Sequence, residues 1–391
     1  MKIESIDLFY FALPKVRDIA DGSQDSFVVR VRSDTGLEGF GESDSSPLVA
    51  FACYCTPTSH SNIVPLQQIL AGQTVDSPDD IRRIYDHARR RALDMAHLPH
   101  AYAAADIALW DLLGKHLDQP IYRLLGYDRQ HAKRAYGSYL FGDTPDETRD
   151  RAAVAVRDGF TAVKFGWGPM GKVDEEFDID LVRQARAGLG GDVALMVDAG
   201  TPWQYDDDTA LQRARGFEPF GVTWLEEPLA PDAVAAYGRL SSASPIPVAA
   251  GEGCDTVRAA EDLLEHGGVH FLQIDSGRIG GITPTMHTVR LAAQHGATFV
   301  NHTFKSHILL AAMMHTFAGE QQASWLEYCG SGSPLIEAMV DTPIKVDSAG
   351  FVSLPEGPGL GIKVNLRRAG EFARHIDIRI DRKSIGTTAD P

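Results

Sequence analysis

Cysteine is scarce in this chain of 391 residues, which contains Cys53, Cys55, Cys254 and Cys329 and no other cysteine. They are too few and too scattered to form a disulfide framework in a chain of this size. A soft-metal site would need a second pair spaced like Cys53 and Cys55, and the sequence has none. We therefore expect reduced thiols and a cytoplasmic location.

Long apolar runs and an excess of positive charge are also lacking. No segment approaches the roughly 18 consecutive apolar residues of a membrane span, and residues 1–7 lack the order of a signal peptide. The formal net charge of −16 would repel nucleic acids and anionic membranes. The sequence therefore favours a soluble protein that acts on small molecules, with neither nucleic acid nor membrane as a partner.

The N-terminal part of the chain predicts a mixed α and β region. Segment 43–64 is rich in Ser, Pro, Thr and His and shows little periodicity, so we expect a long loop there. Helices are predicted at 77–93, which begins with a capping Ser-Pro-Asp-Asp, and at 101–115, which is apolar nearly all round and hence buried. Alternating residues predict antiparallel strands at 3–11, 25–32 and 37–42.

From about residue 134 the pattern changes to short apolar strands that alternate with amphipathic helices, which is typical of a parallel sheet with crossover helices. The predicted strands are 135–140, 162–165, 194–197, 222–225, 248–250, 271–274, 298–300 and 323–326. A polar residue stands at the C-terminal end of each strand after the first: Lys164, Asp198, Glu226, Glu252, Asp275, His302 and Glu327. The pattern predicts an α/β fold of the (β/α)8 or TIM-barrel type, with all these side chains at one mouth.

Three consecutive strand ends carry the carboxylates Asp198, Glu226 and Glu252. Oxygen ligands of this kind suit a hard divalent cation, whereas zinc prefers histidine or thiolate. We therefore predict that these residues bind Mg²⁺. The alternative is that each acid only pairs with a Lys or Arg.

The residues at the ends of the next strands predict a proton-transfer reaction. His302 and Asp275 lie on neighbouring strands, where the carboxylate can fix the imidazole tautomer and make it a general base. Lys164, across the mouth, could transfer a proton, bind a substrate carboxylate or pair with Asp198. With Glu327, if protonated, or Lys164 as donor, the set suits removal of a proton α to a carboxylate, since a metal stabilises the enediolate.

The chain resembles the enolase superfamily over roughly residues 1–365. The motifs that carry the resemblance are Gly39-Phe40-Gly41-Glu42, the helix from Ala104 to Leu112, Met196-Val197-Asp198, Trp224-Leu225-Glu226-Glu227-Pro228, Gly251-Glu252, Arg278-Ile279-Gly280-Gly281 and Gly357-Pro358-Gly359-Leu360-Gly361. The resemblance implies a modified barrel, (β/α)7β, at 126–339. It also implies an α+β capping domain at 1–125, completed by 340–391, and Mg²⁺ on the three carboxylates.

With Asp275 and His302 at these two strand ends, the chain resembles the mandelate racemase group of that superfamily. Many members of that group dehydrate acid sugars. The group often carries Lys-x-Lys on the second strand, but here the segment is Lys164-Phe165-Gly166. Because a racemase needs a base on each face of the enediolate, we expect a sugar-acid dehydratase that forms a 2-keto-3-deoxy acid by syn or anti elimination. An epimerase, racemase or cycloisomerase, and a non-catalytic sugar-acid-binding protein, are the alternatives.

Substrate specificity is expected to come from loops of the capping domain, at 18–26 and at 43–62 with His60. Trp167 could stack on the substrate or plug the barrel rim, and Tyr139 could replace the missing acid or base. We expect 350–364 to return to the N-terminal domain and the tail beyond Asn365 to lack a core face and end in a mobile segment. The family's barrels commonly assemble, so a homo-oligomer is expected.

Overall fold

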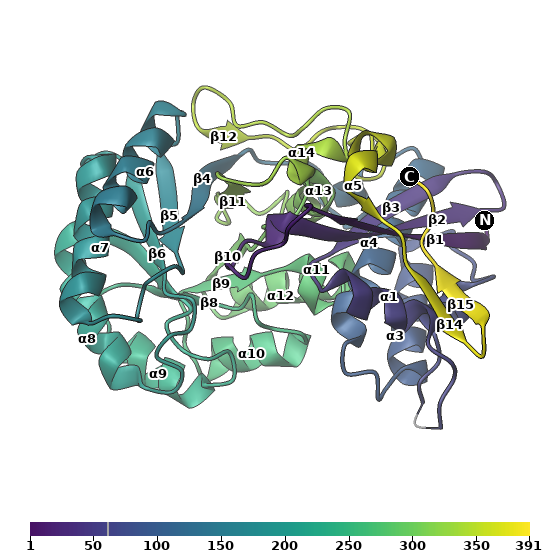
Figure 1. The fold of residues 1–391 in the computed structure, drawn as a ribbon, viewed down its shortest axis with the longest axis horizontal. Helices are drawn as coiled ribbons and strands as arrows, with labels where there is room; N and C mark the ends of the chain where they lie inside the picture. The colour runs from purple at the N-terminus through teal and green to yellow at the C-terminus, as the bar shows by residue number, and fades with distance from the viewer. Residues whose placement is uncertain (61) are drawn as a thin grey trace.

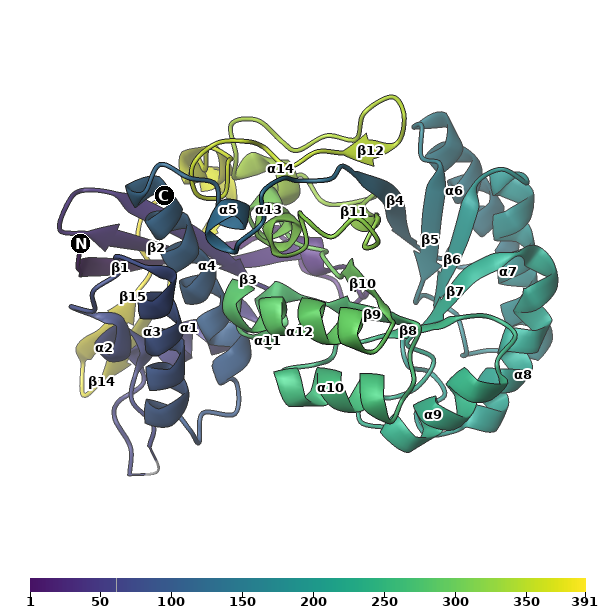
Figure 2. The same ribbon diagram turned by 180° about the vertical axis from the view of Figure 1, so that it is seen from behind.

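The computed structural model describes residues 1–60 and 62–391. A parallel barrel ringed by helices forms one half of the molecule, and an antiparallel sheet with its own helices forms the other (Figure 1). Both chain termini lie on the side of the antiparallel sheet, as the view from behind also shows (Figure 2). The predicted barrel with an α+β capping domain is therefore confirmed. Among the described residues, no helix is long and apolar enough to cross a membrane.

The capping sheet has the strand order β13-β1-β2-β3. Its strands are β1 (Ile3–Ala12), β2 (Asp25–Ser33), β3 (Glu38–Ser43) and β13 (Ala373–Arg374). Helix α4 (Leu98–His116) packs on β3 so closely that a Cβ at Gly41 would lie 2.0 Å from the carbonyl oxygen of Ala104. The glycines of β3 thus let a helix that is apolar on all sides bury itself between the sheet and the barrel. The other capping helices are α1 (Pro47–Cys55), α2 (Leu66–Leu70), α3 (Pro78–Arg91) and α5 (Ile121–Leu124).

Helix α1 corrects the loop that we predicted for 43–64. Pro47 stands in its first turn and most of its side chains are buried, including Phe51 and Tyr54. The exposed residues of α1, Leu48 and Val49, are apolar as well, so the sequence shows no contrast between a buried and an exposed face. The predicted helices at 77–93 and 101–115 are confirmed as α3 and α4; Ser61 lies outside the described residues.

The barrel strands run parallel in the order β10-β9-β8-β7-β6-β5-β4-β11. They are β4 (Lys133–Leu140), β5 (Ala162–Gly166), β6 (Ala194–Asp198), β7 (Val222–Glu226), β8 (Val248–Ala250), β9 (Phe271–Ile274), β10 (Thr298–Asn301) and β11 (Trp325–Cys329). The side chain of Asn301 joins the two ends of this order. Its amide donates to the carbonyl of Glu327 at 3.2 Å and accepts from the Glu327 N–H at 2.8 Å. An asparagine side chain therefore replaces a backbone pair where the barrel closes.

The helices on the outside of the barrel follow its strands in turn. They are α6 (Pro145–Arg157), α7 (Glu175–Leu189), α8 (Asp207–Phe217), α9 (Val234–Ala243), α10 (Val257–Glu265), α11 (Ser276–Ile279), α12 (Ile282–Gln294) and α13 (His307–Thr316), with α14 (Leu335–Ala338) after the last strand. Asp106 of α4 accepts bonds from the N–H and hydroxyl of Thr283 in the first turn of α12. A capping-domain carboxylate thus fixes a barrel helix.

Two of the predicted strand-end residues, Glu327 and Lys164, lie within their strands. Strand β11 begins at Trp325 rather than 323, because its parallel pairing with β4 starts where Trp325 meets Arg134. Glu327 therefore lies inside β11 rather than after it. Lys164 likewise lies in the middle of β5. Both side chains therefore project from within the barrel rather than from its rim.

The C-terminal segment is more ordered than we predicted. Residues 366–372 form a 3₁₀ helix that buries Leu366, Ala369 and Phe372, and β13 then pairs with β1. A hairpin of β14 (Asp377–Ile380) and β15 (Lys383–Thr387) follows, and Gly386 packs against Cys55 of α1. The core face was missed because its few apolar residues are separated by charged ones. Upstream, β12 (Phe351–Val352) pairs with β4 of the barrel, although it lies in the stretch we assigned to the capping domain.

Candidate active site

A cavity of about 1110 Å³ opens at the C-terminal ends of the barrel strands. Its floor contains Lys164, Asp198, Glu252, His302 and Glu327. Its wall includes residues 16–22 of the capping domain, so the expected specificity loop at 18–26 reaches the site. None of the described residues of 45–60 and 62 lines this cavity, and His60 is exposed.

Three carboxylates form the deepest part of the site. Asp198 ends β6, Glu226 ends β7 and Glu252 follows β8, and one oxygen from each lies within 4.8 Å of the others. Burial raises the pKa of Asp198 well above its usual range, and repulsion from Glu226 raises it further. Glu252 Oε2 is buried and accepts no hydrogen bond from the described residues, although His302 Nε2 lies 3.3 Å away. The donor set therefore fits a hard divalent cation.

Two neutral donors hold Glu226 in place. Its Oε2 accepts from Trp224 Nε1 at 2.9 Å and from Gln273 Nε2 at 2.8 Å. Sequence reasoning quoted Trp224 only as part of a motif and did not name Gln273 at all. Trp224 stands two positions before Glu226 on the same strand, so it faces the same side, and this spacing could have identified it. Gln273 lies on another strand and only the fold brings it close.

Lys164 lies among these acids. Its Nζ pairs with Glu226, with Glu327 Oε1 at 2.8 Å and with Asp198 Oδ2 at 3.6 Å. Burial acts to lower the pKa of Lys164, but Glu226 and Glu327 hold it well above its usual range. The ion pair with Asp198 that we considered is thus present, as one of three. The ammonium partly neutralises the buried carboxylates.

Each carboxylate oxygen of Glu327 has a partner of its own. Its Oε2 accepts from the Thr303 N–H at 2.7 Å, and its Oε1 faces the Lys164 ammonium. Both partners offer protons to it. Glu327 acts as a hydrogen-bond acceptor in both contacts, and the donor role that we considered for it stays a prediction.

His302 and Asp275 form a hydrogen-bonded pair on neighbouring strands. His302 Nδ1 lies 2.7 Å from Asp275 Oδ2, and the Gly277 N–H donates to Asp275 Oδ1 at 2.6 Å. Burial acts to lower the pKa of His302, but nearby carboxylates, above all Glu252, outweigh it and raise the pKa to about 10. The imidazole is therefore oriented by one carboxylate and faces the carboxylate cluster with its other nitrogen.

Arg278 and Asp44 were not among the predicted site residues, yet they complete this side. Arg278 donates to Glu252 Oε1 at 2.9 Å and to Asp44 Oδ2 at 2.7 Å. Lys305 lies 3.5 Å from Asp44 Oδ1 and 2.9 Å from Asp25 Oδ1. Arg278 belongs to a motif quoted above, but Asp44 follows β3 of the capping sheet. The ion pairs therefore connect the carboxylate cluster to the capping domain.

The opposite side is occupied by small or apolar groups. A Cβ at Gly166 would lie 2.7 Å from the Cβ of Asp198, which explains why a glycine stands there. Trp167 adopts φ 54°, and its ring covers Gly200 at the wall of the cavity. The Tyr139 ring lies 6.1 Å from Phe160 and 6.0 Å from Phe165, and its buried hydroxyl has no partner among the described residues. Tyr139 thus packs against aromatic rings and also lines the cavity, and the acid or base role that we considered for it stays a prediction.

Family models match both halves of the chain. Residues 147–369 match the model described as "Enolase C-terminal domain-like". Residues 15–126 match the N-terminal domain of the "Mandelate racemase / muconate lactonizing enzyme" model. Together these matches cover most of the described fold.

Individual proteins with similar sequences have several activities. A D-galactarolactone cycloisomerase from Agrobacterium fabrum is 30% identical, over 88% of this chain and 90% of its own length. An L-talarate/galactarate dehydratase from Salmonella typhimurium is 28% identical, over 87% of this chain and 81% of its own.

Solved structures agree on the fold. A predicted mandelate racemase from Rhodobacter sphaeroides is 41% identical, with a TM-score of 0.94 over 99% of both chains. A racemase from Streptomyces coelicolor with bound magnesium is 25% identical, with a TM-score of 0.81 over 95% of this chain and 100% of that one.

Proposed function

The chain belongs to the enolase superfamily, in its mandelate racemase-like group, and on that basis we propose that it dehydrates a sugar acid to a 2-keto-3-deoxy acid. The relatives named above include a dehydratase, a cycloisomerase and racemases, so their names do not decide between these reactions. The observation that carries the proposal is the asymmetry of the site. One side holds the His302–Asp275 pair. On the other side Gly166 supplies no side chain, and Lys164 is held in ion pairs with acids of the barrel.

Asp198, Glu226 and Glu252 would hold a Mg²⁺ ion at the floor of the cavity. When bound, the ion would act as a Lewis acid that stabilises negative charge on the substrate carboxylate. Trp224 and Gln273 keep Glu226 oriented, and Arg278 does the same for Glu252. The ligands are therefore held in place before the substrate arrives, which favours binding.

His302 is the base in this proposal, and its Nδ1–H donates to Asp275. A cation held by Glu252 would weaken the main cause of the raised pKa of His302, so that the lone pair of Nε2 becomes free to remove the C2 proton of the substrate. The C3 hydroxyl then leaves as water with one proton, either from His302 in a syn elimination or from another donor in an anti elimination. The enol product tautomerises to the 2-keto-3-deoxy acid. All atoms are accounted for, because the substrate loses one hydrogen from C2 and one hydroxyl from C3.

Lys164 would bind the substrate carboxylate. Its ammonium is buried against three acids in the barrel. A cation bound by Asp198 and Glu226 would reduce their hold on the ammonium, and a substrate carboxylate placed between Lys164 and the metal ligands would restore its ion pair. Glu327 would keep the ammonium in position.

A second candidate is cycloisomerisation of a lactone through the same enediolate. It is favoured by the 30% identity to a D-galactarolactone cycloisomerase, and it also needs only one base. Racemisation fits less well, because reprotonation on the opposite face would need a base where Gly166 stands. The two remaining reactions differ in whether the product loses water.

The test is a screen of mono- and diacid sugars and their lactones with Mg²⁺, in ordinary and deuterated water. Semicarbazide detects the keto acid and mass spectrometry detects loss of water. A 2-keto-3-deoxy acid from a sugar acid supports the proposal. C2 epimers without any keto acid would exclude it, and a product with the mass of its lactone substrate would assign the cycloisomerase reaction.

A further inference from the structure

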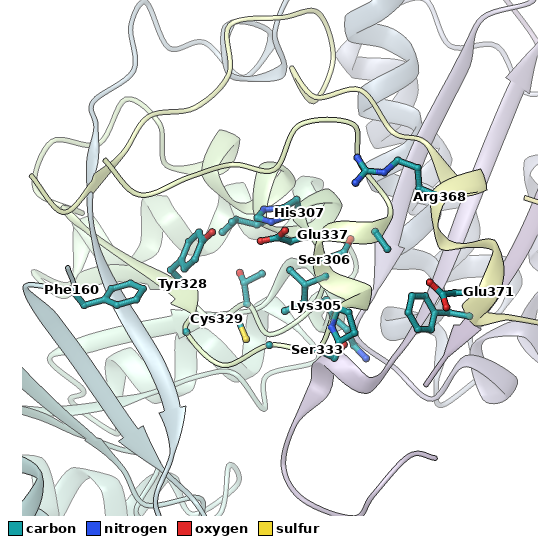
Figure 3. Close-up of a pocket in the computed structure, with 18 residues that line it drawn as sticks. Phe160, Lys305, Ser306, His307, Tyr328, Cys329, Ser333, Glu337, Arg368 and Glu371 are labelled. Atoms are coloured by element: carbon teal, nitrogen blue, oxygen red, sulfur yellow. The ribbon is translucent and has the colours of Figure 1, made fainter. Parts of the chain in front are cut away.

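A second cavity of about 570 Å³ lies apart from the barrel mouth. Strand β11, the start of α13, α14 and the 3₁₀ helix at 366–372 surround it, and Figure 3 shows the side chains that line it. The loop after β11 separates the two spaces, since Ser331 lines the mouth whereas Gly330 and Gly332 line the second cavity. The volume is within the range of about 300–1,000 Å³ typical of small-molecule sites. The reaction proposed above uses none of this space.

His307 in the wall of this cavity has unused hydrogen-bonding capacity. The residue is 2% exposed, and neither ring nitrogen has a hydrogen-bond partner among the described residues. Burial lowers the pKa of His307 to about 4, so the ring is neutral near pH 7 and offers one donor and one acceptor. Buried polar groups without partners are rare, and histidine turns easily about its second side-chain torsion. A hydroxyl group, which both donates and accepts, would satisfy either nitrogen.

The interior of the cavity has no charge to offer a ligand. Among the described residues, Lys305 is the only charged group on its inner wall, and it is already paired with Asp25 and Asp44. The remaining charged residues, Arg368, Glu337 and Glu371, are exposed and of opposite signs. A charged ligand would lose its hydration without gaining a buried counter-charge, whereas an uncharged ligand would not.

Aromatic rings form one wall. The rings of Tyr328 and Phe160 lie 6.2 Å apart at 46°, and the Tyr328 hydroxyl donates to the Ile344 carbonyl at 3.0 Å, which fixes that ring. Ser333, in another part of the lining, donates its hydroxyl proton to the Ser23 carbonyl at 2.6 Å, so it can only accept from a ligand. The Thr303 hydroxyl already donates to the His302 carbonyl and accepts from Asn301. Apolar rings on one side and neutral hydrogen-bonding groups on the others match a molecule with C–H faces and hydroxyl edges.

We propose that this cavity binds an uncharged, hydroxyl-rich ring of monosaccharide size, at a site separate from the barrel mouth. The proposal does not depend on the reaction assigned to the mouth. His307 and Ser333 hydrogen-bond the hydroxyls, and Tyr328 packs against the C–H face.

The experiment titrates the Mg²⁺-loaded protein with D-galactose, D-glucose, L-arabinose and D-galactono-1,4-lactone, followed by calorimetry and saturation-transfer NMR. D-galactosamine and D-galacturonate add one charge to the same ring and serve as charge controls. We expect at least one uncharged probe to bind with a Kd in the millimolar range, about tenfold or more tighter than its charged counterpart. Binding should persist in His302→Asn, which alters only the mouth.

Two variants locate the site. His307→Leu removes both nitrogens, and Ala338→Phe fills the cavity from α14; each should weaken binding at least tenfold while leaving kcat/KM unchanged. Ala338→Ser, at the same position without the bulk, should bind within about twofold of the wild type. If His307→Leu fails to fold, the pair of Ala338 variants decides. The proposal is overturned if no uncharged probe saturates the protein, if both variants bind like the wild type, or if a charged probe binds more tightly in a His307-dependent manner.

Discussion

The two sides of the barrel mouth are built differently. On one side Asp275 holds His302, and Arg278 links Glu252 to Asp44 of the capping domain. On the other side Lys164 is enclosed by acids and Gly166 has no side chain at all. The first side can move a proton, whereas the second can bind charge. A site of this kind is suited to chemistry on one face of its substrate.

Removing the metal is expected to lower the activity more than any substitution on either side of the mouth. Dialysis against EDTA is expected to lower turnover by about 10⁴-fold or more, because the charge of the enediolate would then be uncompensated. Mg²⁺ should restore activity. In Asp198→Asn, calorimetry should show Mg²⁺ affinity at least about tenfold weaker. Full turnover in EDTA would contradict the metal assignment.

Removing the proposed base, His302, is expected to cause the second-largest loss of activity. His302→Asn is expected to reduce kcat by about 10³- to 10⁴-fold and to stop exchange of the C2 hydrogen with deuterated water. His295→Asn, at an exposed position, serves as the matched control and should behave like the wild type. If exchange continued in His302→Asn, a base on the Lys164 side would have to exist.

Removing the orienting carboxylate should have a smaller effect. Asp275→Asn is expected to lower kcat by about 10²-fold with little change in KM. The Asp275 hydrogen bond raises the pKa of His302, so without it the pKa falls and the acidic limb of the kcat/KM profile moves to lower pH. Asp208→Asn, on the exposed face of α8, is the control. An unchanged pH profile of kcat/KM would show that Asp275 does not affect the pKa of the base.

Substitution of Gly166 is expected to have the smallest effect. It tests the side of the mouth that lies opposite His302. The Cβ of Gly166→Ala would press on Asp198, so we expect a loss of about 1–3 kcal/mol in unfolding free energy. Mg²⁺ affinity should fall roughly tenfold. Gly191→Ala adds the same atom where no other atom lies within 4 Å and is the matched control. Equal behaviour of the two variants would show that the space beside Asp198 is less constrained.

The sequence predicts the barrel and its strand-end residues because each short apolar strand is followed or interrupted by a polar residue near its C-terminal end. Asp198, Glu226 and His302 could be placed in this way without knowledge of any contact. Asp44 and Asn301 could not, because their roles arise from pairing with residues distant in the chain. Helix α1 and the C-terminal strands were missed for the opposite reason. The local pattern is weak where the exposed face is also apolar, as in α1, or where apolar residues are sparse, as in the C-terminal strands.

The pairing of β13 with β1 has a consequence for how the protein is made. Tyr10 pairs with Arg374, so the edge of the capping sheet cannot form until residue 374 has left the ribosome. The barrel strands pair mostly with neighbours in sequence and can assemble earlier during synthesis. The capping sheet would therefore be completed last, around a barrel already in place, and truncation before residue 373 should leave β1 as an unprotected edge open to aggregation.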